Sequence, residues 1–141
     1  MAKKAVLRSK DENRSNNLIV YAISSAETDL SICQKINLNL NIRLQLDADY
    51  EIPIKNQTHS FRRYHYEDEE LIEKYDLFVN RSDNQFLFPE IKKVDFVLII
   101  HTEAHPGLIE SAIQGLKGDL VISAIYKVDP ASLRSLKRLP F

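Results

Sequence analysis

The sequence has little cysteine, almost no net charge and no long apolar run, and each of these excludes a class of protein. Cys33 is the single cysteine, so neither an internal disulfide framework nor a cysteine-rich zinc site can form. The formal net charge of −1 gives no overall attraction to nucleic acid or to a membrane surface. The longest apolar runs are well short of the ~20 residues that span a bilayer. We therefore expect a cytoplasmic protein without a cofactor, without membrane association and without DNA specificity.

The length of 141 residues suits one domain that can bury a substantial core. Residues 1–16 contain five Lys or Arg residues against two acidic residues and carry no apolar periodicity. The sequence therefore predicts a flexible basic arm over 1–16, followed by a single domain over 17–141.

The apolar run Val94 to Ile100 dominates the pattern of the chain, because it is typical of a strand that is covered on both faces. Residues 18–23 and 120–128 have the same two-faced character. Pro106 starts a predicted helix with a buried apolar stripe, and Gly118 ends it. Other patterns predict a helix over 29–37, a half-exposed strand from Leu38 to Asp47, a connection over 47–57, strands over 60–66 and 73–80, and a short helix after Asp129-Pro130.

This order of elements predicts an α+β fold. The expected architecture is a single domain with a mixed, mostly antiparallel sheet and about three helices. Strand 94–100, helix 106–117 and strand 120–128 should form a C-terminal βαβ unit with a right-handed crossover and parallel strands.

The segment Phe-Pro-Glu-Ile-Lys-Lys-Val-Asp-Phe, residues 88–96, resembles the signature of the IPExxxVDY family. Pro89, Glu90, Val94 and Asp95 stand at the spacing of that signature, while Phe88 and Phe96 replace its Ile and Tyr. The family consists of small, uncharacterised Bacteroidota proteins. The resemblance therefore implies no activity, and Phe96 argues against any role that needs a phenol at that position.

Glu90 and Asp95 are candidates for an acid/base pair or for ligand binding. In an extended chain their five-residue separation would place them on opposite faces. The alternative is structural: Asp95 accepts backbone N–H bonds or pairs with an arginine, and Glu90 shapes the turn. If Asp95 is buried and paired, its removal should cost about 2–4 kcal/mol.

His101, Glu103 and His105 follow a predicted central strand and invite a metal interpretation. Their spacing is not the helical pattern of metalloproteases, and Gly107 alone does not make a phosphate-binding loop. A polar surface loop is the simpler interpretation, and no metal site is predicted.

Two basic segments are candidate binding sites. Arg62, Arg63 and Tyr64 resemble the aromatic and basic surface of a sheet that stacks RNA bases, although alternation along a strand would divide the two arginines between its faces. The second segment, near the C-terminus, forms a basic helical face that could meet RNA phosphate or an acidic protein. Its residues are Arg134, Lys137 and Arg138.

No serine, cysteine or lysine has a recognisable activating partner in the sequence. We therefore expect a non-catalytic binding or adaptor domain. The first alternative is an RNA-associated protein, and the second is a small enzyme that uses Glu90, Asp95 or the His101–His105 loop. A homodimer is also expected, because the two-faced strands need covering and two helices on one face would leave the other exposed.

Overall fold

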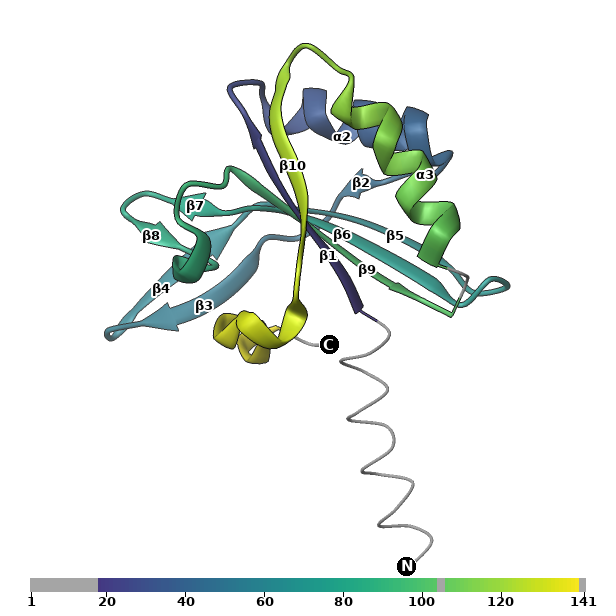
Figure 1. Ribbon diagram of the computed structural model, residues 1–141. Helices are drawn as coiled ribbons and strands as arrows, with labels where there is room; N and C mark the ends of the chain where they lie inside the picture. The colour runs from purple at the N-terminus through teal and green to yellow at the C-terminus, as the bar shows by residue number, and fades with distance from the viewer. Residues whose placement is uncertain (1–17, 104–105, 140–141) are drawn as a thin grey trace, which may run out of the picture.

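A six-stranded antiparallel sheet forms the centre of the molecule (Figure 1). The computed structural model describes residues 18–103 and 106–139, so the predicted arm over 1–16 lies outside the described residues. The strand order is β10-β1-β9-β6-β5-β2, and all five pairings are antiparallel. The bounds are β1 Leu18–Ser25, β2 Gln45–Leu46, β5 Arg63–Asp68, β6 Glu73–Val79, β9 Phe96–Thr102 and β10 Ile122–Val128.

The C-terminal βαβ unit is confirmed, with β1 placed between its two strands. β1 pairs antiparallel with β9 on one side and with β10 on the other, so β9 and β10 run parallel to each other. The helix α3 (Pro106–Lys117) makes the crossover between them. β1 has a neighbouring strand on each side, and both faces of the sheet are covered at this position. Seven of its eight residues are therefore buried, which explains its continuous apolar run.

Both helices cover the same face of the sheet (Figure 1). The helix α2 (Asp29–Leu40) begins at Thr28, whose hydroxyl accepts a hydrogen bond from the Ser31 N–H at 3.2 Å. Ile32 and Ile36 of α2 are fully buried against the sheet, together with apolar side chains of α3. Cys33 is buried beside them.

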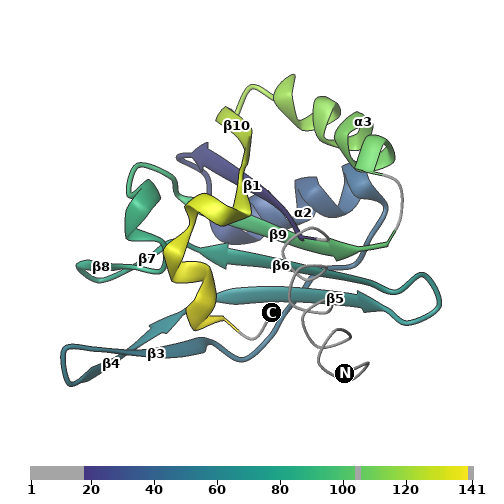
Figure 2. The same cartoon turned by 60° about the horizontal axis from the view of Figure 1, so that its bottom comes forward.

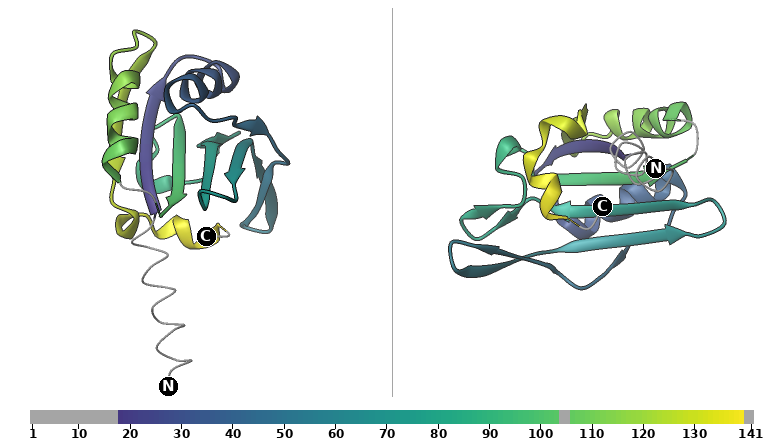
Figure 3. Two further views of the ribbon diagram at one scale, coloured as in Figure 1. Left: turned by 90° about the vertical axis from the view of Figure 1, so that its right-hand side faces the viewer. Right: turned by 90° about the horizontal axis from the view of Figure 1, so that it is seen from below.

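The opposite face is covered by short segments that lie far apart in the sequence (Figures 2 and 3). These are the hairpin of β3 (Tyr50–Ile54) and β4 (Gln57–Phe61), and the 3-10 turns η1 (Pro89–Ile91), η2 (Pro130–Ser132) and η3 (Arg134–Arg138). Apolar side chains that these segments and their flanks bury against the sheet include Ile52, Phe61, Phe88, Leu133 and Leu139. The face that was expected to require a dimer is thus covered within the chain, and the dimer itself stays a prediction.

The predicted strand from Leu38 to Asp47 is wrong for most of its length. The helix α2 continues to Leu40, and only Gln45 and Leu46 pair as β2. Asn41 ends the helix in the left-handed region (φ 55°), and the side chain of Asn37 then holds Leu44 by two hydrogen bonds. The alternation of Leu and Asn is compatible with the last helical turn, because Leu38 simply points to solvent with 84% of its surface exposed.

The predicted connection over 47–57 is also wrong, because it contains β3 and the turn to β4. Lys55 and Asn56 have positive φ values of 51° and 67°, which suits the tight turn of a two-residue hairpin. The predicted strand 60–66 is divided at Arg62, which separates β4 from β5. A second small hairpin, formed by β7 (Arg81–Ser82) and β8 (Gln85–Phe86), follows β6.

Within the described part of the chain, neither helix has the length and apolar character that crossing a membrane requires.

Candidate functional site

The segment that carries the resemblance, residues 88–95, is held in place by the side chain of Asn80. Asn80 is fully buried just after β6. Its Nδ2 donates hydrogen bonds to the carbonyl oxygens of Ile91 and Val94, both at 3.0 Å, and its Oδ1 accepts one from the Phe88 N–H at 2.8 Å. The Asn80 N–H donates to the Asp95 carbonyl at 2.9 Å. One buried amide therefore satisfies three backbone groups that the turn η1 would otherwise leave unpaired.

Glu90 connects this segment to the C-terminal turn η3. Its carboxylate accepts hydrogen bonds from the Ser135 N–H at 2.9 Å and from the Ser135 hydroxyl at 2.6 Å. Partial burial alone would raise the pKa of Glu90, but these hydrogen bonds favour the charged form and hold the pKa below its usual value. Glu90 is thus an anchor between two turns, which agrees with the structural alternative.

The turns η1 and η3 contact each other, which brings together two basic segments that are more than 40 positions apart in the sequence. Lys92 and Lys93 follow η1, and Arg134 and Lys137 belong to η3; all four are exposed. We call these four residues the basic surface. Lys92 and Lys93 also line a groove of about 380 Å³ between residues 89–94 and Tyr126 of β10. The groove offers ammonium groups beside apolar and aromatic walls, a combination suited to an acidic ligand with some apolar surface.

Arg138 does not belong to the basic surface, although the sequence grouped it with Arg134 and Lys137. Its Nη2 donates to the Leu87 carbonyl at 2.6 Å, and its own carbonyl accepts from the Tyr50 hydroxyl at 2.7 Å. These bonds fasten η3 to the β3–β4 hairpin and to the segment before η1. Arg138 therefore acts inside the fold.

Asp95 is exposed, so the condition for a loss of about 2–4 kcal/mol on its removal is not met. Its Oδ2 accepts a hydrogen bond from the Ser25 N–H at 2.8 Å, at the point where the register between β1 and β10 shifts. The structural alternative is confirmed in its first form, because Asp95 accepts a backbone N–H. Glu90 and Asp95 serve different elements, so the structure gives them no shared acid/base geometry.

Arg62 and Tyr64 are both directed at Asp29, on the side of the sheet that carries the helices. The Tyr64 hydroxyl donates to Asp29 Oδ2 at 2.7 Å, and Arg62 Nη1 donates to the same oxygen at 3.1 Å. Burial alone would raise the pKa of Asp29, but the two hydrogen bonds lower it, and burial with this bond raises the pKa of Tyr64 to about 12. These residues clamp β5 to the start of α2 and present no stacking platform.

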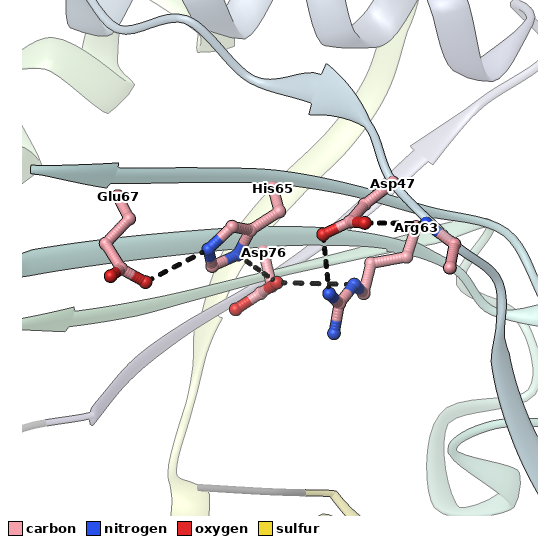
Figure 4. A network of polar contacts seen from close by, with 6 residues as sticks. Asp47, Arg63, His65, Glu67 and Asp76 are labelled. Carbon is pink, nitrogen blue, oxygen red and sulfur yellow. Dashed lines mark hydrogen bonds and ion pairs between the residues drawn. The ribbon is translucent and has the colours of Figure 1, made fainter.

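Arg63 faces the other side of the sheet and belongs to a polar network centred on the buried Asp76 (Figure 4). Asp76 is 2% exposed in the middle of β6, and its Oδ1 lies 2.7 Å from His65 Nδ1. When Asp76 is ionised its carboxylate can only accept, so His65 Nδ1 then donates in this contact. Arg63 Nη2 donates to Asp47 at 2.7 Å, while its Nε lies 3.8 Å from Asp76. Burial raises the pKa of Asp76, and His65 and Arg63 oppose this shift.

This network joins β5, β6 and the residue after β2, and its groups are directed at one another (Figure 4). His65 Nε2 is also occupied, because it lies 3.3 Å from Glu67 Oε1. A histidine held by a carboxylate is a common general base, but no serine or cysteine within the described residues forms a hydrogen bond with His65. The network therefore fits a structural role.

His101 and Glu103 lie at the end of β9 and just beyond it, whereas His105 lies outside the described residues. Across residues 18–103 and 106–139, no group of three His, Cys, Asp or Glu side chains could hold a metal ion. The enzyme alternative based on this loop has no test among the described residues and stays a prediction.

Sequence reasoning missed Asn80, Asp76 and Ser135. A signal existed for Asp76, since it interrupts the apolar run of residues 75–79 with a charged side chain. Asn80 gave no such signal, because an isolated Asn after a strand is ordinary in a turn. Ser135 lies among the basic residues of η3 and gave none either.

The chain was compared with protein families and with curated proteins. No family model matches it, and no curated protein gives a significant match.

Proposed function

We propose that the chain is a non-catalytic, cytoplasmic binding or adaptor domain, and that its basic surface binds an acidic partner protein. The proposal includes membership of the IPExxxVDY family, which rests on the residues at positions 88–95. The observation that supports it is the contact between η1 and η3, which brings together the two segments that carry the exposed residues Lys92, Lys93, Arg134 and Lys137.

The charges of this surface are available for a partner. The neighbouring carboxylate of Glu90 is already bound by Ser135, and no ion pair within the described residues involves any of the four cations. Other charged candidates are engaged inside the fold: Arg62 with Asp29, Arg63 with Asp47, and Arg138 with Leu87. Exposed cations beside an open groove favour electrostatic recognition of an acidic segment.

The experiment isolates the molecules that copurify with the chain from its native cell. The variant Lys92→Glu/Lys137→Glu reverses two charges of the basic surface. The control Lys55→Glu/Lys117→Glu makes the same change in net charge at two exposed lysines outside that surface. We expect nuclease-resistant protein partners that the control retains and the first variant loses.

Two results would contradict the proposal. Partners retained equally by both variants would remove the basic surface from the binding site. Copurifying material that nuclease treatment removes would favour the RNA-associated alternative, whose phosphates would meet the same cations.

A further inference from the structure

The strand β10 is the long open edge of the sheet. It lies at one end of the strand order and has seven residues, whereas β2 at the other end has two. Apart from β1, no group within the described residues forms a hydrogen bond to the backbone of residues 123–128. An edge strand presents a row of N–H and C=O groups, and natural proteins usually shorten or cover such an edge. β10 has no proline and is not shortened.

Two residues of the basic surface, Lys92 and Lys93, line the groove beside this edge. Tyr126 of β10 is 45% exposed and forms one wall of the groove, and residues 89–94 form the other. Tyr126 pairs with Ala22 of β1, whose side chain lies on the face opposite the helices. Because side chains alternate along a strand, a chain that paired with β10 would direct every second side chain to this face, and those nearest Tyr126 would lie beside the groove that Lys92 and Lys93 line.

The opposite set of side chains would meet a different surface. Lys127 points to the helix side, where its Nζ forms an ion pair with Glu110 of α3 at 3.1 Å. Glu110 thus already compensates the charge of Lys127. The helix side of β10 therefore does not favour an acidic side chain from a partner. The two sides of β10 consequently favour a ligand in which acidic residues alternate with uncharged ones.

We propose that an extended acidic segment of a partner protein adds to β10 as a further strand, with alternate carboxylates facing Lys92 and Lys93. This inference rests on the proposed function and specifies the partner and its mode of binding. Main-chain hydrogen bonds to the edge supply affinity, and the lysines select acidic side chains. A second copy of the chain is disfavoured at this edge, because it would bring a second basic surface to the first.

The probe is a fluorescein-labelled peptide of eight residues in which Glu and Val alternate. Two further versions carry N-methyl groups on alternate peptide bonds, one version on the even and the other on the odd positions. Each methylated peptide loses the N–H donors along one side of its extended backbone and keeps those along the other. Binding is measured by fluorescence anisotropy, and amide hydrogen exchange of residues 123–128 is followed with and without the unmodified peptide.

We expect the unmodified peptide to bind, one methylated version to bind equally well, and the other to bind at least tenfold more weakly. The amides of 123–128 should exchange more slowly in the complex. The variant Lys92→Glu/Lys93→Glu should weaken binding to a similar extent, while the control Lys55→Glu/Lys117→Glu should bind as the wild type does.

The possible failures are distinguishable. Equal binding of all three peptides would overturn strand addition and leave the proposed acidic recognition standing. Absence of binding by the unmodified peptide would contradict both. Slow exchange of 123–128 without peptide, together with a mass of two chains, would assign the edge to a second copy and overturn the inference.

Discussion

Asp76 and Asp95 lie in neighbouring parts of the same sheet and have opposite surroundings. Asp76 is in the middle of β6, almost fully buried, and it contacts His65 and lies close to Arg63. Asp95 comes just before β9, is exposed, and accepts one backbone N–H. Their comparison shows that a carboxylate next to a buried strand need not be buried, because the end of β9 leaves Asp95 open to water.

The comparison divides the polar residues of the molecule into two groups. Those around Asp76 compensate one another inside the sheet, so removing any of them should affect stability. Those around residues 88–95 shape a surface segment, and its exposed cations face outward. Stability and binding should therefore respond to different substitutions.

The largest expected effect is that of Asp76→Ala. Removing this carboxylate leaves His65 Nδ1 without its partner and removes the buried charge beside Arg63, which keeps its ion pair with Asp47, so we expect a loss of about 3–5 kcal/mol in the free energy of unfolding. Urea denaturation measures it. Asp95→Ala is the comparison, with an expected loss of about 1 kcal/mol, since one exposed hydrogen bond is removed. Equal losses for the two variants would contradict the assignment of Asp76 as the buried centre.

Asn80→Ala should be the next most costly. The substitution leaves the Phe88 N–H and the carbonyls of Ile91 and Val94 without a partner, which should cost about 2–4 kcal/mol. Hydrogen exchange should also show faster opening of residues 88–94 than of β6. A loss below about 0.5 kcal/mol in urea would show that Asn80 does not organise the segment.

The sequence predicts an element of the fold when the signals for that element lie within its own segment. It does not predict a contact between segments that are distant in the sequence. The runs 18–23 and 94–100 and the helix beginning at Pro106 were predictable, because their periodicity and end signals lie within each segment. The hairpin of β3 and β4 was not, because Pro53 and the polar residues around it are typical of a connection. Asn80 acts on a segment that begins eight residues later, and only the folded chain brings the two together.

The same limit applies to the basic residues near the C-terminus. Arg134, Lys137 and Arg138 are equivalent in the sequence, but Arg138 alone turns inward to Leu87 because η3 is a short 3-10 turn rather than a regular helix. Charge spacing on an assumed helix could not reveal that difference.

Arg138→Glu and Lys137→Glu test this distinction directly. Arg138→Glu should cost about 1–3 kcal/mol in urea, because it removes the hydrogen bond to Leu87 and places a carboxylate beside a carbonyl. Lys137→Glu should change stability by less than about 0.5 kcal/mol, as an exposed substitution. Similar stability of the two variants would show that Arg138 is not held inside the fold and belongs with Lys137 in the basic surface.

The smallest expected effect concerns Glu90 and pH. Its pKa in the folded chain lies below the ordinary value of 4.5, so its stabilising contribution is present above that value and is lost as the pH falls through the folded pKa. Urea denaturation of the wild type and of Glu90→Gln should differ at about pH 7, and the difference should shrink below about pH 4.5. A difference that grows on acidification would contradict the bonds to Ser135.

The most direct test of the account measures stability and peptide binding together in two variants, Asp76→Asn and Lys92→Glu/Lys137→Glu. Binding is measured with the alternating Glu and Val peptide, under conditions in which both variants are folded. The account predicts that Asp76→Asn loses stability and binds the peptide as the wild type does. The charge-reversed variant should keep its stability and lose binding at least tenfold. The opposite pattern, with binding lost in Asp76→Asn and retained after charge reversal, would contradict the separation of a buried structural network from an exposed basic surface.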